Sequence, residues 1–378
     1  MAESQTQPER IDLGRAEDPR DVVHRIVATL AQGGWIALAG AGQVVLAASA
    51  LQPAAVDGAG QVADDEPGSL PATLWLRGAE EVSDWVPELS LLGARLARRC
   101  WPGAVTLMFP PSRECGLLQR LEPSVQARFQ PPHELALSVP GEGFLRDTLR
   151  LLPGPIVARM IERGEESLDD WLGRLPAEAR CRLAIDALPG DLSTAVTVAR
   201  ITPVGWEMVR AGAVNEAQLT RMAGTIFLFV CTGNTCRSPM AEALCKLLIA
   251  ERLGCQPEEL ESRGYVVLSG GIAAVSGMPA AGNAIDVIRD RGGTLDDHAS
   301  RKLTVDLVRQ ADHVLAMTGD HLDTLLEHVP EVASRARLLH PDGLDVPDPV
   351  GADRDTYRRT AEAIEAYLRR LLDDLGVT

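Results

Sequence analysis

The second half of the chain alternates short apolar runs with longer amphipathic segments. Residues 226–230 are all apolar, which is the pattern of a strand buried on both faces. Pro239 suits the first turn of a helix whose apolar face holds Met240, Leu244, Leu247 and Leu248. The same pattern predicts strands at 265–268 and 313–317 and helices around 280–290, 304–310, 319–328 and 354–374. Strands and helices in alternation are typical of a doubly wound parallel sheet.

The first half of the chain also contains both strand-like and helix-like patterns of apolar residues. Val22, Val23, Ile26, Val27 and Leu30 recur at helical spacing. Residues 35–51 are apolar but too short for a membrane span and interrupted by Gln43, so they predict buried strands joined by a turn at 40–42. A flexible acidic loop is expected at 57–71, followed by a helix ending at 94–98, a turn at 101–103 and a strand at 104–109. This half is therefore expected to be a mixed α/β domain.

Composition divides the chain near residue 222. All six Trp lie before this point and all three Tyr lie after it. A chain of 378 residues is longer than one typical domain. We therefore expect two domains, residues 1–222 and 223–378.

Charge and cysteine content limit the partners. The net charge of -16 and the lack of a basic run argue against a nucleic-acid or membrane partner. The seven Cys are odd in number and lack the spacing of a zinc site, so no metal or cofactor is expected. The first residues lack the layout of a signal peptide. A reducing cytoplasm is the expected location, and an anion would have to bind in a small local pocket.

Such a pocket is predicted where the strand at 226–230 ends. A strand, a short loop and a helix start can surround a tetrahedral anion with backbone N–H groups and the positive end of the helix dipole. Gly233 and Asn234 tolerate the left-handed backbone that such a loop needs. The positive field would lower the pKa of Cys231, and Arg237 could hold two phosphate oxygens. The alternative is a buried structural Cys231 with Arg237 on the surface.

At these residues the chain resembles the low-molecular-weight protein-tyrosine-phosphatase family. The resemblance lies in FVCTGNTCRSPMAEA at 229–243, in 298–318 and in 346–349. It implies that Cys231 is the nucleophile, that Arg237 is catalytic and that Asp348 is the general acid, acting on a phosphorylated protein through a phosphocysteine. It also implies a phosphate-binding set: Thr232, Gly233, Asn234, Thr235, Cys236 and Ser238. Without the loop that follows Cys231, an aspartate before a proline, as at Asp348, would indicate only a turn.

Two positions bear on the substrate. Tyrosine-directed members of the family have an aliphatic residue where this chain has Thr235, and an aromatic residue where it has Val350. A hydroxyl group and no stacking ring favour phosphoarginine over phosphotyrosine, as in bacterial protein-arginine phosphatases. Cys236 could either form a protective disulfide with Cys231 or pack behind the loop. His298 is expected to be a surface histidine, with a cap or hydrogen bond near the active face as the alternative. A thioredoxin-coupled arsenate reductase is disfavoured because no Cys follows Cys255.

The first half resembles, more faintly, the YrdC-like threonylcarbamoyl-adenylate synthase family. The resemblance lies in short segments at 33–37, 101–106, 154–158, 193–196 and 209–213. The family's polar substrate segment is replaced by AGAGQVV at 39–45, and this half contains no Lys for ATP phosphates. We expect a degenerate domain that binds a small molecule, a nucleotide or a partner. The alternatives are a bifunctional protein that retains synthase activity through Ser193 and Thr194, and a phosphatase-like binding scaffold.

Overall fold

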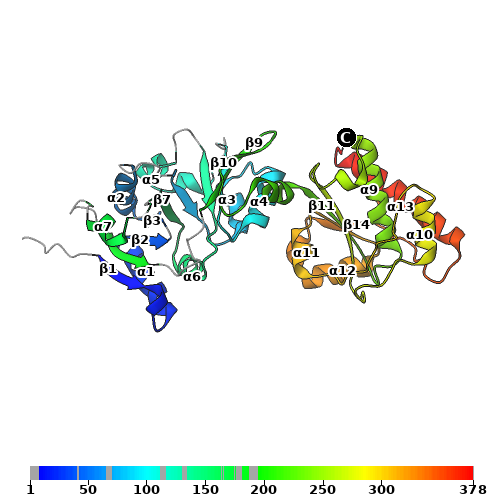
Figure 1. Cartoon of the computed structure of the whole chain (residues 1–378), viewed down its shortest axis with the longest axis horizontal. Coiled ribbons are helices and arrows are strands. Elements are labelled where there is room, and N and C mark those ends of the chain that lie inside the picture. The colour runs from blue at the N-terminus through cyan, green and yellow to red at the C-terminus, as the bar shows by residue number, and fades with distance from the viewer. Residues whose placement is uncertain are drawn as a thin grey trace, which may run out of the picture. The chain divides into compact units, whose positions relative to one another are not determined.

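The structure is a computed structural model that describes residues 8–40, 42–64, 70–110, 116–129, 134–162, 164, 166–173, 175, 181–186 and 195–377. The chain forms two compact units, Met1–Met222 and Ala223–Thr378. Both units combine helices with strands (Figure 1).

The C-terminal unit is built on a four-stranded parallel sheet in the order β12-β11-β13-β14. Its strands are β11 (Thr225–Cys231), β12 (Tyr265–Gly271), β13 (His313–Ala316) and β14 (Ala336–Leu338). Its helices are α9 (Arg237–Leu253), α10 (Gly282–Arg289), α11 (Val305–Gln310), α12 (Gly319–His328) and α13 (Arg354–Asp374). The parallel α/β sheet expected from the sequence is confirmed, and β14 is an additional strand that the sequence pattern did not predict.

Strand β11 has two buried faces because helices cover both sides of this sheet. Phe227, Phe229 and Cys231 belong to the core that contains residues of α9, α10 and α13. The alternate residues Ile226, Leu228 and Val230 belong to a second core with residues of α11 and α12. Because alternate residues of β11 face two different cores, every position is apolar and the strand appears in the sequence as a continuous apolar run.

The N-terminal unit contains a ten-stranded mixed sheet in the order β1-β8-β2-β3-β7-β4-β6-β5-β9-β10. Its strands are β1 (Glu9–Asp12), β2 (Trp35–Gly40), β3 (Gln43–Ser49), β4 (Thr73–Trp75), β5 (Val105–Phe109), β6 (Leu135–Ser138), β7 (Ile156–Glu162), β8 (Cys181–Asp186), β9 (Thr197–Thr202) and β10 (Gly205–Arg210). Its helices are α1 (Pro19–Ala31), α2 (Pro53–Asp64), α3 (Val82–Trp85), α4 (Leu91–Cys100), α5 (Pro123–Ala127), α6 (Gly143–Leu151), α7 (Leu168–Gly173) and α8 (Glu216–Ala223).

The apolar stretch at 35–51 forms the antiparallel pair β2 and β3, as the sequence predicts. Residue 41, in the expected turn, lies outside the described residues. All of β3 is buried, and β3 also pairs with β7 on its other side. A strand paired on both edges and covered on both faces needs the apolar composition that made this stretch resemble a membrane segment.

The acidic loop expected at 57–71 was wrong for residues 57–64, which belong to helix α2. The helix buries Ala55, Val56, Ala59, Val62 and Ala63. Its acidic side chains Asp57 and Asp64 both pair with Arg128, and Asp64 also pairs with Arg159.

Arg128 contacts both acidic side chains of the helix. Its guanidinium lies 3.1 Å from Asp57 Oδ1 and 2.8 Å from Asp64 Oδ2. A Cβ added at Gly60 would lie 2.7 Å from Arg128 Nη1, so the glycine leaves room for this close approach. Residues 65–69 of the expected loop lie outside the described residues.

Gly271, at the end of β12, provides a test of the packing around the loop at 232–236. A Cβ added there would lie 2.5 Å from Thr232 O and 3.0 Å from Asn234 N, both backbone atoms. We expect Gly271→Ala to lower the free energy of unfolding of the C-terminal unit by about 1–3 kcal/mol, measured by chemical denaturation. Gly270→Ala is the matched control, because its Cβ would meet only the Leu303 side chain closely. Equal stability of the two variants would contradict this packing.

Candidate active site

The loop after β11 lies at the carboxyl end of a central strand. Cys231 is the last residue of β11, and α9 begins at Arg237. Because β12 and β13 flank β11, the loop lies where ligands bind in open parallel sheets. The local sequence accounts for this placement, since the apolar run forms the strand and Pro239 fits the first turn of the helix.

The Cys231 thiol is buried among hydrogen-bonding groups. Its Sγ lies 2.9 Å from Ser238 Oγ and accepts a hydrogen bond from Asn234 N at 3.2 Å. In the N-terminal unit, burial raises the pKa of the Cys100 and Cys181 thiols to about 12 each. Those two thiols remain protonated at neutral pH.

Asn234 fixes the shape of the loop. Its φ is 55°, and its side chain is fully buried. The side-chain Nδ2 donates to Ser238 Oγ at 2.9 Å and to Ser269 Oγ at 2.8 Å, and Oδ1 accepts from Arg301 N at 2.8 Å. Gly233 does not adopt a positive φ, so the expected left-handed backbone was wrong for Gly233 and holds at Asn234.

Arg237 and Asp348 are brought together, although 111 positions separate them in the sequence. The buried Arg237 donates from Nη2 to Asp348 Oδ2 at 2.5 Å and from Nη1 to Val346 O at 3.2 Å. Asp348 also accepts a hydrogen bond from Val350 N at 3.1 Å, which is the geometry of a turn. The carboxylate thus makes the turn contact and also reaches the loop.

Thr235 and Cys236 complete the loop. Thr235 is half-buried, and its carbonyl accepts a hydrogen bond from Ala281 N at 2.8 Å. Cys236 Sγ lies 3.2 Å from Tyr357 OH. Burial and this contact raise the pKa of Tyr357. Cys236 therefore packs behind the loop as a free thiol in this structure, and its disulfide with Cys231 stays a prediction.

Two histidines contact the loop. His298 is half-buried, and its Nε2 donates to Asn234 O at 2.8 Å, so the expected surface histidine was wrong. His321 was not singled out from the sequence. It is buried, with Nε2 2.8 Å from Thr232 Oγ1 and Nδ1 2.8 Å from Thr318 Oγ1. Both histidines lie far from the loop in sequence, so no local motif signals these contacts.

A buried polar chain continues behind the loop. Ser269 Oγ, which accepts from Asn234, donates to Glu242 Oε2 at 2.6 Å. Lys246 Nζ donates to Glu242 Oε1 at 2.6 Å. One of the two lysines of the chain therefore balances a buried carboxylate that supports the loop.

The described residues contain neither a membrane-spanning helix nor a metal cluster. None of the described helices is long and apolar enough to cross a membrane. Within the same residues, no group of three or more His, Cys, Asp or Glu side chains could hold a metal ion.

Comparison with known proteins identifies the family of the C-terminal unit. Residues 226–377 match the model of the low molecular weight phosphotyrosine protein phosphatase family. A protein-arginine-phosphatase of Geobacillus stearothermophilus is 36% identical over 39% of this chain and 94% of its own length. One from Bacillus subtilis is 38% identical over 39% and 95%. The low molecular weight protein-tyrosine-phosphatase Etp of Escherichia coli is 33% identical over 36% and 86%.

Through these residues the chain belongs to the low molecular weight phosphotyrosine protein phosphatase family. The class of enzyme expected from the sequence, a cysteine-dependent protein phosphatase, is confirmed.

The His321 contact predicts a pH dependence of stability. Burial, and then the nearby Arg237 charge, lower the pKa of His321 from its usual 6.5. The unfolded chain therefore takes up a proton more readily, and stability is lost as the pH falls below that value. We expect acidification from about pH 7.5 to about pH 5.5 to lower the melting temperature more in the native chain than in His321→Gln. The melting temperature is measured by calorimetry, for the unfolding transition that inorganic phosphate shifts to higher temperature. His328→Gln is the control. Equal losses in all three proteins would contradict this role.

Proposed function

We propose that the C-terminal domain hydrolyses phosphoarginine in proteins in preference to phosphotyrosine, through a phosphocysteine on Cys231. The observation that carries the chemistry is the position of Cys231 at a loop closed by Arg237 and Asp348. The preference for phosphoarginine is supported by Thr235 in that loop and by the absence of a ring at Val350, which is exposed.

The phosphoryl group would bind between the loop amides and Arg237. The amides are those of five members of the phosphate-binding set: Thr232, Gly233, Asn234, Thr235 and Cys236. A dianion competes with the Asp348 carboxylate for the Arg237 fork, because both are bidentate acceptors. Binding would therefore free Asp348 to face the leaving group.

In the first step the Cys231 thiolate attacks phosphorus. The P–N bond breaks, its electron pair goes to the guanidine nitrogen, and Asp348 donates a proton to that nitrogen. Ser238, 2.9 Å from the thiolate, stabilises the sulfur by hydrogen bonding.

In the second step water attacks the phosphocysteine. The Asp348 carboxylate accepts a proton from the water, the P–S bond breaks, and the thiolate is regenerated with release of phosphate. The same carboxyl group thus acts first as acid and then as base, and no cofactor is required.

Substitution at Thr235 tests the substrate preference. We expect Thr235→Ile to lower the ratio of phosphoarginine to phosphotyrosine turnover roughly tenfold, because an apolar ethyl group replaces a hydroxyl at the pocket wall. The measurement is kcat/KM on matched phosphorylated proteins, with the exposed Thr294→Ile as control. An unchanged ratio would refute the preference while leaving the phosphatase chemistry intact.

Substitution at Asp348 separates its two roles. Asp348→Asn can still accept from Val350 N, so a residue that only forms a turn would tolerate the change. A residue that acts as general acid would not tolerate the change, because an amide cannot donate the proton. We therefore expect turnover of phosphoarginine to fall by about 10²-fold or more. Asp345→Asn, on the same segment, is the control, and Cys231→Ser should abolish turnover. Full activity of Asp348→Asn would show that the carboxylate is only structural.

We further propose that residues 1–222 form a YrdC-like domain that has lost synthase activity. The order of the resembling segments supports the fold, and the lack of Lys supports the loss of activity. Ser193 and Thr194, on which the bifunctional alternative depends, lie outside the described residues. We expect the full chain to release no pyrophosphate from ATP with threonine and bicarbonate; measurable release would restore the bifunctional alternative.

A further inference from the structure

The hydroxyl group of Thr232, the residue after the nucleophile, is held by a buried histidine. Thr232 is exposed, whereas His321 is only 7% exposed. The two side chains meet at 2.8 Å between Thr232 Oγ1 and His321 Nε2. The backbone of Thr232 is also fixed, because its carbonyl accepts a hydrogen bond from Ala273 N at 3.0 Å. The fold therefore sets the position of this hydroxyl group before a substrate binds.

The other ring nitrogen of His321 holds the imidazole in place. Its Nδ1 lies 2.8 Å from Thr318 Oγ1, and the same oxygen caps helix α12 by accepting from His321 N. A neutral imidazole has one donor and one acceptor nitrogen, and a hydroxyl group can meet either of them. In both tautomers the Thr232 oxygen keeps at least one lone pair that binds no described residue. Thr232 can therefore accept a further hydrogen bond while His321 holds it.

The segment that carries Asp348 lies beside His321. Asp345 Oδ1 accepts a hydrogen bond at 2.8 Å from Gly319 N, two residues before the histidine. The charges of Arg237 and Asp348 both reach His321. Because Asp348 would protonate the leaving group, the hydroxyl group that His321 holds lies on the side of the loop where the leaving group departs.

A guanidino leaving group and a phenol offer different groups to such a hydroxyl. The nitrogens of phosphoarginine that carry no phosphate retain N–H groups, which are hydrogen-bond donors. The ring of phosphotyrosine has no donor beside its ester oxygen. A site built to hydrogen-bond one substrate discriminates against a substrate that lacks the matching group. A fixed acceptor at this position therefore favours phosphoarginine.

We propose that Thr232 is a specificity-determining residue, whose hydroxyl group accepts a hydrogen bond from an unphosphorylated guanidino nitrogen of phosphoarginine. His321 is the residue that positions this hydroxyl group. The inference rests on the proposed function and deepens it, because it adds to Thr235 a second contact that a phenol cannot use.

Removal of the hydroxyl group at nearly constant shape tests the contact. We expect Thr232→Val to lower the ratio of kcat/KM for phosphoarginine to kcat/KM for phosphotyrosine about tenfold, measured on matched phosphorylated proteins. General damage to the phosphate loop slows both substrates and cancels in this ratio. Thr232→Ser retains the hydroxyl group and should restore most of the ratio. Thr294→Val, at an exposed threonine outside the site, is the control.

The pH profile tests the positioning role of His321. Burial, and then the Arg237 charge, lower the pKa of His321 from its usual 6.5, while Asp320, Asp345 and Asp348 act in the opposite direction. The imidazole is therefore neutral at about pH 7.5, and its protonation in acid would place a positive charge beside the guanidino group.

We expect acidification to about pH 5.5 to lower the substrate ratio at least about twofold more in the native chain than in His321→Gln. The glutamine can bond to Thr232 but does not titrate. Titration of the substrates themselves is common to both proteins and cancels in the comparison. Parallel profiles would show that His321 is only structural.

The outcomes separate this contact from the proposed function. A native chain that prefers phosphoarginine and keeps its ratio in Thr232→Val would overturn the inference alone. A native chain without that preference would refute the proposed function, and this contact with it. Circular dichroism and melting temperature identify a variant that fails to fold, in which case Thr232→Ala takes the place of Thr232→Val.

Discussion

The C-terminal site depends on one buried residue in a left-handed conformation. Asn234 turns the loop so that its own N–H points at the Cys231 sulfur, while its side chain bonds to Ser238, Ser269 and Arg301 N. An asparagine tolerates this backbone better than most residues do, and its amide supplies the bonds that hold it. The loop is thus shaped by the fold before a phosphoryl group arrives, which is the condition for electrostatic stabilisation in catalysis.

Local sequence was sufficient for the elements that carry the site. The apolar run before Cys231 and the proline at 239 predict the strand and the helix, and the residues between them predict the loop. The contact of His321 could not be predicted, because it joins segments that are distant in sequence, and a contact of His298 near the active face was only the less favoured alternative. Helix α2 was missed for a similar reason, since its acidic residues read as a loop until Arg128 is placed beside them.

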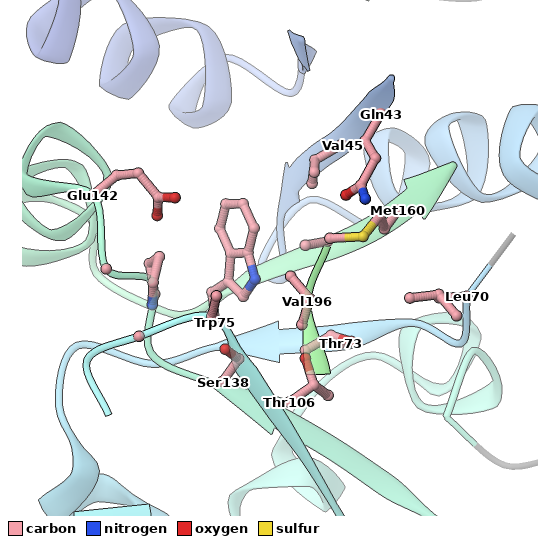
Figure 2. A pocket seen from close by; sticks show the side chains of 15 residues that line it. Gln43, Val45, Leu70, Thr73, Trp75, Thr106, Ser138, Glu142, Met160 and Val196 are labelled. Atoms are coloured by element: carbon pink, nitrogen blue, oxygen red, sulfur yellow. The ribbon is translucent and has the colours of Figure 1, made fainter. Parts of the chain in front are cut away.

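The two units differ in the groups that each offers to an anion. In the proposed mechanism the C-terminal unit surrounds a phosphoryl group with loop amides and Arg237. The N-terminal unit has a cavity of about 240 Å³ with walls from strands β3 to β7 and residues 140–142, and its described lining residues include a carboxylate and no cation (Figure 2).

The most direct test of the proposed chemistry is to identify the covalent intermediate. The full chain is mixed with a phosphoarginine-bearing protein, quenched within one turnover and mapped by mass spectrometry under conditions that preserve phosphocysteine. We predict one phosphoryl group on Cys231, and none in Cys231→Ser. Turnover without a phosphorylated enzyme, or a phosphoryl group on another residue, would contradict the mechanism.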